Sequence, residues 1–296
     1  MTARTISGKE ISAQIYDELR GRIAAFEQRH GRAPHIAVVI VGDDPASQTY
    51  VRLKHDKAQE LGIGSTVLRL PADTAEGALL GVVDGFNRDP AVDGLLVQLP
   101  LPDHIDETRV LLSVDPAKDV DGFHPMNVGR MVMGDPGVLL PCTPHGILQL
   151  LQRSGIAIEG AHVVIVGRSN IVGKPLANLL IQKRQGGNAT VTVCHTRTRD
   201  LGAVTRTADI LVAAVGSIGT ITADMVKPGA VVVDVGTNRV PDPSSPRGSR
   251  QVGDVDLERV REVASAVAPS PGGVGPMTVA MLMWNTVEAA WSHMGR

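Results

Sequence analysis

The chain has 296 residues, of which 43 % are hydrophobic and 20 % are charged. This length predicts about two domains, and the composition is typical of a folded protein with a sizeable core. A net charge of −2 and only seven aromatic residues argue against a nucleic-acid-binding surface, which needs basic side chains and stacking rings. The two cysteines are too few for a disulfide scaffold and favour a reducing compartment.

The first residues, MTARTISGKEISAQI, contain no apolar segment of the kind found in secretory signal peptides. No apolar run in the chain approaches the roughly 18 residues that a membrane-spanning helix needs. We therefore expect a cytoplasmic protein that does not bind membranes.

In the first half of the chain, short β-rich runs alternate with helical patterns. Strands are predicted at 36–42, 65–70 and 93–99, and helices at 11–27, 47–62 and 74–89. Ser47 is a suitable N-cap for the second of these helices, and Gly62 is a suitable end. The resulting βαβαβ order predicts a parallel sheet with right-handed crossovers.

The region 115–144 is rich in Pro, Gly and Asp and is expected to be loop, short helix and domain junction. A second series of strands and helices follows, with a surface loop expected at 240–250. Strands are predicted at 162–167, 190–195, 209–216 and 230–236, and helices at 142–155, 174–184, 254–265 and 276–294. The last helix has too many apolar positions to be exposed, so we expect it to pack back on the first domain.

A glycine-containing turn links the strand at 162–167 to the helix after it. Gly167 permits a tight turn, Ser169 stands where a dinucleotide fingerprint has its middle glycine, and Gly173 permits close packing. Such a turn brings a helix N-terminus to a pyrophosphate. The same residues also suit a plain strand-to-helix turn.

The end of the next strand indicates which dinucleotide would bind. An NAD site usually carries a carboxylate there, but this chain has Cys194-His195-Thr196-Arg197-Thr198-Arg199. Arg197 and Arg168 are suited to a 2′-phosphate through charge-assisted hydrogen bonds, which favours NADP. The alternative is a solvated loop with ordinary surface arginines.

Several polar residues of the first half are candidates for a catalytic site. Tyr50 and Lys54 are four residues apart and share one helix face, and Gln98 ends a predicted parallel strand. Asp119 and Asp121 follow in the junction loop. Without such partners, a tyrosine that packs and a lysine that extends to water would be the ordinary interpretation. Together, these groups predict a lysine that acts as acid or base.

Other catalytic classes lack their motifs. The nine histidines and two cysteines show no metal-ligand spacing, and the chain contains no G-x-S-x-G sequence. We therefore expect no metal site and no serine hydrolase.

Motifs from both halves of the chain resemble the bifunctional methylenetetrahydrofolate dehydrogenase/cyclohydrolase (FolD) family, nearly end to end and in order. The most specific ones are YVRLK, QLPLP, KDVDGFHP and PGGVGPMT, together with VVIVGRSNIVGKPLANLL.

The resemblance implies a two-step reaction of one-carbon metabolism, which serves purine, histidine and methionine biosynthesis. NADP⁺ oxidises 5,10-methylenetetrahydrofolate to the 5,10-methenyl form, which is then hydrolysed to 10-formyltetrahydrofolate. The implied fold is α/β, with two domains flanking a cleft. Residues 1–142 plus 272–296 would form the folate-binding catalytic domain with a parallel sheet, and residues 143–271 a Rossmann-like NADP-binding domain. Family members usually form homodimers through the cofactor domain.

The resemblance also implies roles for individual residues in folate chemistry. Lys54 matches the catalytic lysine, and Gln98 matches the glutamine that bonds to it. Tyr50 matches the tyrosine that packs against the aminobenzoyl group, and Asp121 matches the aspartate that binds the pterin. The turn expected to line the pterin site consists of Pro271, Gly272, Gly273 and Val274.

On the cofactor side, the matching turn consists of Gly167, Arg168 and Ser169, and further contacts are expected at Thr196, Arg197 and Thr237. Three departures from the family pattern lie here. The turn at 183–190 is longer than expected, 216–222 lacks a proline, and Thr237 stands where isoleucine is common.

Two other functions are alternatives to the bifunctional enzyme. A dehydrogenase that lacks the hydrolytic step would not need both Lys54 and Gln98. A non-catalytic folate- or nucleotide-binding protein would be expected to have lost part of the set Tyr50, Lys54, Gln98 and Asp121. The chain retains all four residues, which favours the bifunctional enzyme.

Overall fold

A computed structural model of the chain describes residues 2–244 and 248–295. The chain divides into two compact units, one formed by Met1–Ala13 and Thr143–Thr278 and the other by Gln14–Cys142 and Val279–Arg296. Each unit contains a parallel sheet with helices, so the predicted α/β class is confirmed. The predicted functional domains, 1–142 plus 272–296 and 143–271, stay a prediction. The compact units group residues 1–13 with the second half of the chain.

The unit Gln14–Cys142 and Val279–Arg296 contains a three-stranded parallel sheet of order β3-β2-β4. The predicted βαβαβ arrangement is confirmed, with β2 (His35–Val41), α2 (Pro45–Glu60), β3 (Gly64–Leu70), α3 (Glu76–Arg88) and β4 (Gly94–Val97). The central strand β2 is almost wholly buried, as expected for a parallel strand covered on both faces. The junction region contains two further short helices, α4 (Glu107–Ser113) and α5 (Pro125–Val132).

Helix α2, which carries Tyr50 and Lys54, begins earlier than predicted. Its N-cap is Asp44, whose side chain accepts a hydrogen bond from the backbone N–H of Ser47 at 2.7 Å. Pro45 occupies the first turn, where the missing N–H costs nothing. The prediction of Ser47 as the cap was therefore wrong. Gly62 does end the helix, with the positive φ of 80° that such an ending requires.

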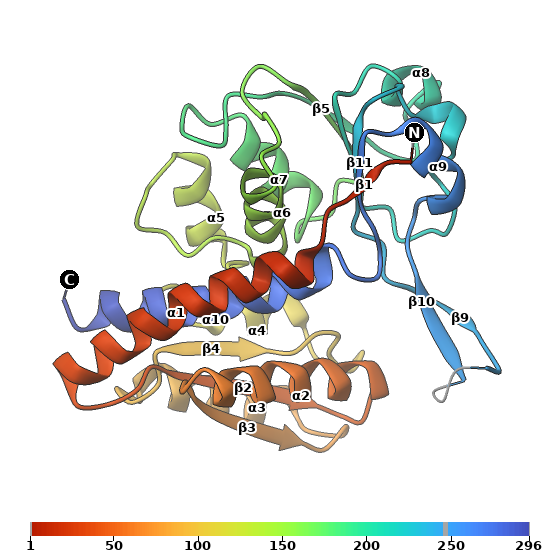
Figure 1. Ribbon diagram of the computed structural model, residues 1–296. Helices are drawn as coiled ribbons and strands as arrows, with labels where there is room; N and C mark the ends of the chain where they lie inside the picture. Colours follow the sequence, from red (N-terminus) through yellow and green to blue (C-terminus); the bar gives the residue numbers. More distant parts are fainter. Residues whose placement is uncertain (1, 245–247, 296) are drawn as a thin grey trace. The chain divides into compact units, whose positions relative to one another are not determined.

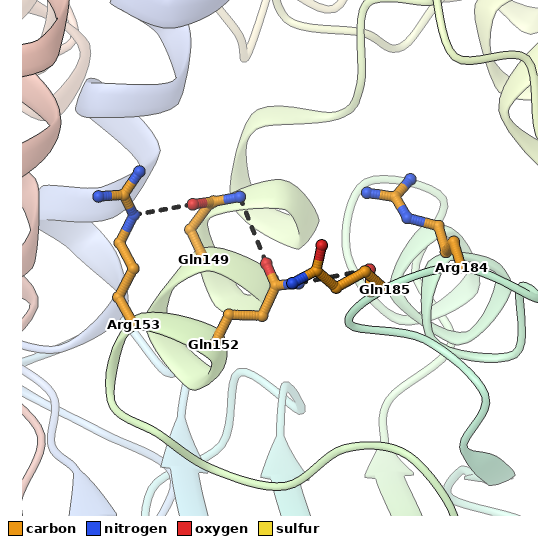
Figure 2. A pocket seen from close by; sticks show the side chains of 5 residues that line it. All are labelled: Gln149, Gln152, Arg153, Arg184 and Gln185. Carbon is orange, nitrogen blue, oxygen red and sulfur yellow. Dashed lines mark hydrogen bonds between the residues drawn. The ribbon is translucent and has the colours of Figure 1, made fainter.

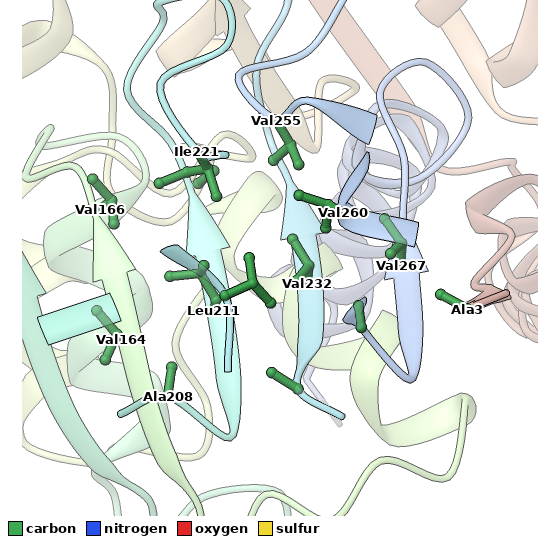
Figure 3. Close-up of a cluster of buried hydrophobic side chains, with 14 of the residues drawn as sticks. Ala3, Val164, Val166, Ala208, Leu211, Ile221, Val232, Val255, Val260 and Val267 are labelled. Atoms are coloured by element: carbon green, nitrogen blue, oxygen red, sulfur yellow. The ribbon is translucent and has the colours of Figure 1, made fainter. Parts of the chain in front are cut away.

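The unit Met1–Ala13 and Thr143–Thr278 is built on a six-stranded parallel sheet of order β1-β11-β8-β7-β5-β6. Its strands are β1 (Arg4–Thr5), β5 (His162–Val166), β6 (Thr190–Cys194), β7 (Ile210–Ala213), β8 (Val231–Asp234) and β11 (Ala266–Ala268). Its helices are α6 (Cys142–Arg153), α7 (Gly173–Leu180), α8 (Leu201–Thr205), α9 (Leu257–Val263) and the short 3₁₀ helix η1 (Ala223–Met225). A core of small apolar side chains, among them Val164, Leu211 and Val232, packs against this sheet (Figure 3).

The predicted surface loop at 240–250 is partly a hairpin. Strands β9 (Asn238–Pro241) and β10 (Ser249–Val252) pair antiparallel. Residues 245–247 of the predicted loop lie outside the described residues.

The two longest helices, α1 (Gly8–His30) and α10 (Val274–His293), lie side by side (Figure 1). Phe26 meets the edge of Trp291 with ring centroids 5.3 Å apart, and Arg22 donates to Glu288 at 2.8 Å. The terminal helix thus returns to residues of the first half of the chain, as predicted. No helix within the described residues combines the length and apolar character that crossing a bilayer requires.

Candidate active site and nucleotide pocket

Lys54 and Gln98 are brought together by α2 and the end of β4. The Lys54 Nζ donates a hydrogen bond to Gln98 Oε1 at 3.0 Å. The Gln98 backbone N–H continues the sheet by donating to Val39 O at 2.8 Å, and its side-chain Nε2 donates to Leu99 O at 2.7 Å. The amide is therefore held with its oxygen toward the lysine. Lys54 and Gln98, the pair predicted from the sequence, are thus in direct contact.

The Asp121 side chain is half-buried in the loop between α4 and α5. Burial raises its pKa, the nearby Lys54 ammonium opposes this rise, and the charge of Asp119 adds to it. Because Asp121 responds to the charge of Lys54, the two side chains share one electrostatic environment. The structure thus groups Lys54, Gln98 and Asp121 within one unit.

Asp119 organises this loop rather than facing a ligand. Its buried carboxylate accepts hydrogen bonds from the backbone N–H of Gly122 at 3.1 Å and of His124 at 2.8 Å, and from Asn127 Nδ2 at 3.0 Å. Gly122 has a φ of 75°, and a Cβ there would lie 2.5 Å from the backbone of Leu140. Asp121 is consequently held on a fixed main chain.

Tyr50 lies one helical turn before Lys54 on α2 and is 38 % exposed. A tyrosine that only filled the core would be buried. The exposed ring is available to pack against a ligand beside the lysine, as the predicted role requires.

Two further residues, which were not predicted from the sequence, support this site. Asn285 of α10 donates from its Nδ2 to Val120 O and to Leu140 O, each at 2.8 Å. The Cys142 thiol donates to Val120 O at 3.2 Å, and burial raises its pKa well above the usual value. The available sequence signal was an asparagine within the mostly apolar run of α10, because a buried amide needs hydrogen-bond partners.

A pocket of about 250 Å³ opens at the carboxyl ends of β5, β6 and β7 in the other unit. Four predicted cofactor residues line it, namely Gly167, Arg168, Ser169 and Thr196. The remaining lining residues are Val166, His195, Leu201, Ala214, Val215 and Thr220. Ligands of open parallel sheets lie at this edge.

The turn after β5 is too tight for side chains at its glycines. A Cβ on Gly167, whose φ is 132°, would lie 2.1 Å from Ala214 O, and one on Gly173 would lie 2.1 Å from Gly167 O. Ser169 stabilises the turn, since its Oγ accepts from the Val172 N–H at 3.1 Å. The main chain can therefore come close to a ligand, which is the fit a pyrophosphate needs.

Not every predicted cofactor residue lines this pocket. Arg197 and Thr237 are exposed side chains outside its lining. The turn Pro271–Val274 lies at the start of α10, with Pro271 and Gly272 exposed and the next two residues buried. The roles expected for these residues stay predictions.

A second pocket, of about 550 Å³, holds none of the predicted site residues (Figure 2). Its lining comes from α6 and the turn after α7, and consists of Gln149, Gln152, Arg153, Arg184 and Gln185. Hydrogen bonds link Arg153 to Gln149, Gln149 to Gln152, and Gln152 to the Gln185 carbonyl. The longer turn at 183–190 thus closes on α6. This lining lacks a nucleophile and a general base.

Histidine, cysteine and carboxylate side chains form no cluster of three or more with metal-binding geometry within residues 2–244 and 248–295.

Both halves of the chain match models of one protein family. Residues 6–121 match the catalytic domain of tetrahydrofolate dehydrogenase/cyclohydrolase, and residues 141–294 match its NAD(P)-binding domain. The chain belongs to this family. The resemblance found in the sequence motifs is confirmed.

Individual relatives of this family match nearly end to end. The bifunctional protein FolD of Prosthecochloris aestuarii is 54 % identical over 290 residues, covering 97 % of this chain and 98 % of that protein. FolD of Syntrophobacter fumaroxidans is 52 % identical over 294 residues, with 99 % of each chain covered.

Solved structures of FolD enzymes have the same fold. The Campylobacter jejuni enzyme superposes with a TM-score of 0.91 at 46 % identity, covering 98 % of this chain and 99 % of its own. The Trypanosoma brucei enzyme, solved with NADP cofactor and an inhibitor, superposes with a TM-score of 0.94 at 39 % identity over the whole of both chains.

Proposed function

We propose that this FolD-family chain oxidises 5,10-methylenetetrahydrofolate with NADP⁺ and hydrolyses the resulting methenyl compound to 10-formyltetrahydrofolate. The observation that carries the proposal is the hydrogen bond from Lys54 Nζ to Gln98 Oε1. A dehydrogenase alone has no use for this pair, because the substrate's own nitrogen stabilises the cation that hydride loss creates. A cyclohydrolase needs a group that moves protons when water attacks.

In the hydrolytic step, Lys54 would assist the attack of water on the methenyl carbon and transfer protons between the water and the ring nitrogen that leaves. Gln98 would hold the ammonium through its fixed oxygen and so orient it. Asp121 would hydrogen-bond the pterin from its fixed loop, and Tyr50 would pack against the aminobenzoyl group. The turn Pro271–Val274 is assigned to the same substrate.

NADP⁺, when bound, supplies the hydride acceptor of the first step. Gly167 and Ser169 would place the turn backbone against its pyrophosphate, and Thr196 would contact the ribose. Arg168 and Arg197 would bind the 2′-phosphate, and Thr237 would add a contact from the segment between β8 and β9. In this assignment residues 143–271 bind the nucleotide, and residues 1–142 with 272–296 bind the folate and carry the catalytic lysine.

We also propose that two copies associate through the nucleotide-binding unit, in the cytoplasm. Among the residues that the structure describes, strand β6 is the last strand of its sheet, so one row of its backbone groups has no partner strand. The exposed side chains Val193, on β6, and Ile181, at the end of α7, add apolar surface nearby in the chain.

The test of this function is the variant Lys54→Met. Its rate of methenyl hydrolysis should fall about a hundredfold or more, because general acid–base catalysis contributes a factor of this size. The variant should still fold and bind NADP⁺. Methenyl hydrolysis, circular dichroism and nucleotide titration measure these three properties.

The matched control is Lys57→Met on the same helix. Lys57 pairs with Glu60 and lies over the Tyr16 ring, so its loss should leave both activities near wild type. Formation of 10-formyltetrahydrofolate by Lys54→Met at the wild-type rate would overturn the role of the lysine.

A further inference from the structure

Asp254 is a fully buried carboxylate in the nucleotide-binding unit that none of the proposed roles uses. It lies between β10 and α9 and is not itself one of the residues that line the nucleotide pocket. Its two oxygens accept four hydrogen bonds. Oδ2 accepts from the N–H groups of Val215 at 2.7 Å and Gly216 at 2.9 Å, and Oδ1 accepts from the Ser217 N–H at 3.0 Å and Asn238 Nδ2 at 2.8 Å.

Three of these donors are successive backbone groups of the loop that forms one wall of the nucleotide pocket. That loop begins at Ala214 and Val215 and ends at Thr220, and all three of these residues line the pocket. The backbone of Asp254 holds the far end as well, because its carbonyl accepts from the Ile221 N–H at 3.1 Å. One residue therefore fixes both ends of this wall.

Asp254 is itself held in place by the neighbouring strand. Asp234, at the end of β8, accepts hydrogen bonds from the N–H groups of Asp254 at 2.9 Å and Val255 at 3.3 Å. The two glycines that contact these carboxylates, Gly253 and Gly236, leave no room for a side chain. A Cβ on Gly253 would lie 1.6 Å from Asp234 Oδ2, and one on Gly236 would lie 2.4 Å from Asp254 Oδ1.

The wall needs such an anchor because its own sequence does little to stiffen it. Residues 216–222 lack a proline, and Gly216 and Gly219 both adopt positive φ, of 72° and 65°. Glycines without a restraining contact lose much conformational entropy when they are ordered. A buried carboxylate with several N–H donors supplies that restraint through charge-assisted hydrogen bonds.

We infer that Asp254 is a positioning residue for nucleotide binding, which fixes the pocket wall 214–220 through its side chain and its carbonyl. This inference rests on the proposed nucleotide site. The carboxylate holds the wall in its binding conformation before the nucleotide arrives, so that binding does not have to order it. Folate binding and the lysine chemistry take place on other residues and do not depend on it.

The test compares NADP⁺ binding by the full-length wild-type protein with binding by Asp254→Asn. The amide keeps the size of the side chain but replaces one acceptor oxygen by an NH₂ group that faces backbone N–H donors. The Kd and KM for NADP⁺ should rise about tenfold or more. The KM for methylenetetrahydrofolate and the kcat at saturating NADP⁺ should change less than threefold, and hydrogen exchange of amides 215–217 should accelerate.

Asp209→Asn is the matched control. Asp209 also accepts a backbone hydrogen bond, from the His162 N–H at 2.9 Å, but at the opposite end of the same sheet from the pocket. The Asp209→Asn variant should bind NADP⁺ with a Kd within twofold of the wild-type value. Asn238→Ala is the milder variant, which removes one donor and leaves the carboxylate with three. This variant should fold, and its affinity for NADP⁺ should fall about two- to fivefold. If Asp254→Asn fails to fold, an unchanged affinity in Asn238→Ala would overturn the inference.

A folded Asp254→Asn protein that binds NADP⁺ within twofold of wild type would overturn the inference while leaving the proposed function standing. Equal loss of folate and nucleotide affinity would also overturn it, because that pattern belongs to a general structural role. A wild-type protein that does not bind NADP⁺ would overturn the proposed function itself, and the positioning role with it.

Discussion

At the scale of single residues, the site depends on contacts between side chains and backbone groups far apart in the sequence. Tyr50, Lys54, Gln98 and Asp121 could be singled out from their places on predicted elements, because a helix face and a strand end are local features. The bond from Asn285 to Val120, 165 residues apart, leaves no local pattern. The four-donor environment of Asp254 likewise exists only in the folded chain.

Arg168 is the single residue from which we expect the largest contribution to the preference for NADP⁺ over NAD⁺. Its exposed side chain lines the nucleotide pocket, so Arg168→Ala should weaken NADP⁺ binding by about 1.5–3 kcal/mol, the range of hydrogen bonds to charged groups. NAD⁺ lacks the 2′-phosphate and should bind the variant and the wild type equally. Titration of both nucleotides measures the difference.

Arg206→Ala provides the comparison for Arg168→Ala. Arg206 is another exposed arginine of the same unit, and it donates to the Asp224 carbonyl outside the pocket. It should leave both affinities unchanged. If Arg168→Ala weakened the binding of NAD⁺ as much as the binding of NADP⁺, the arginine would recognise something other than the 2′-phosphate.

At the scale of elements, the long periodic segments and the buried apolar strands were predictable, and the two shortest strands were not. β1 and β11 have two and three residues and form strands only because they pair with each other and with β8. Helix α7 ends at Leu180 instead of the predicted 184, since Ala189 N–H donates back to Leu180 O and Gly186 and Asn188 adopt positive φ. Tertiary pairing and turn geometry outweighed helix propensity at these places.

The close fit between the turn after β5 and helix α7 gives a prediction at the element scale. Gly173→Ala should destabilise the protein by more than about 1 kcal/mol and weaken NADP⁺ binding, because the added Cβ meets the rigid Gly167 carbonyl at 2.1 Å. Thermal unfolding and nucleotide titration measure the two effects.

Gly81→Ala, within α3, is the matched control for Gly173→Ala. A Cβ at Gly81 would meet nothing within 4 Å, so alanine there should stabilise the protein by about 0.5–1 kcal/mol through helix propensity. A Gly173→Ala protein as stable as wild type would show that the turn is looser than its geometry indicates.

At the scale of the whole molecule, the alternation of strands and helices was enough to predict two α/β units. Two of the three divisions between the compact units were harder to place, because they fall at Ala13, within α1, and at Thr278, within α10. Neither helix changes composition at that point. The apolar character of the last helix did predict that it returns to the first half of the chain.

The central claim, that one chain carries both activities with NADP⁺, is tested most directly by an absorbance time course. Purified protein and 5,10-methylenetetrahydrofolate are mixed with NADP⁺ and separately with NAD⁺, and nicotinamide reduction and the methenyl compound are followed together. We expect reduction with NADP⁺, slower reduction with NAD⁺, and no accumulation of the methenyl compound. Reduction accompanied by accumulating methenyl compound would show that the hydrolytic activity is missing, and no reduction with either nucleotide would show that the chain is not a dehydrogenase.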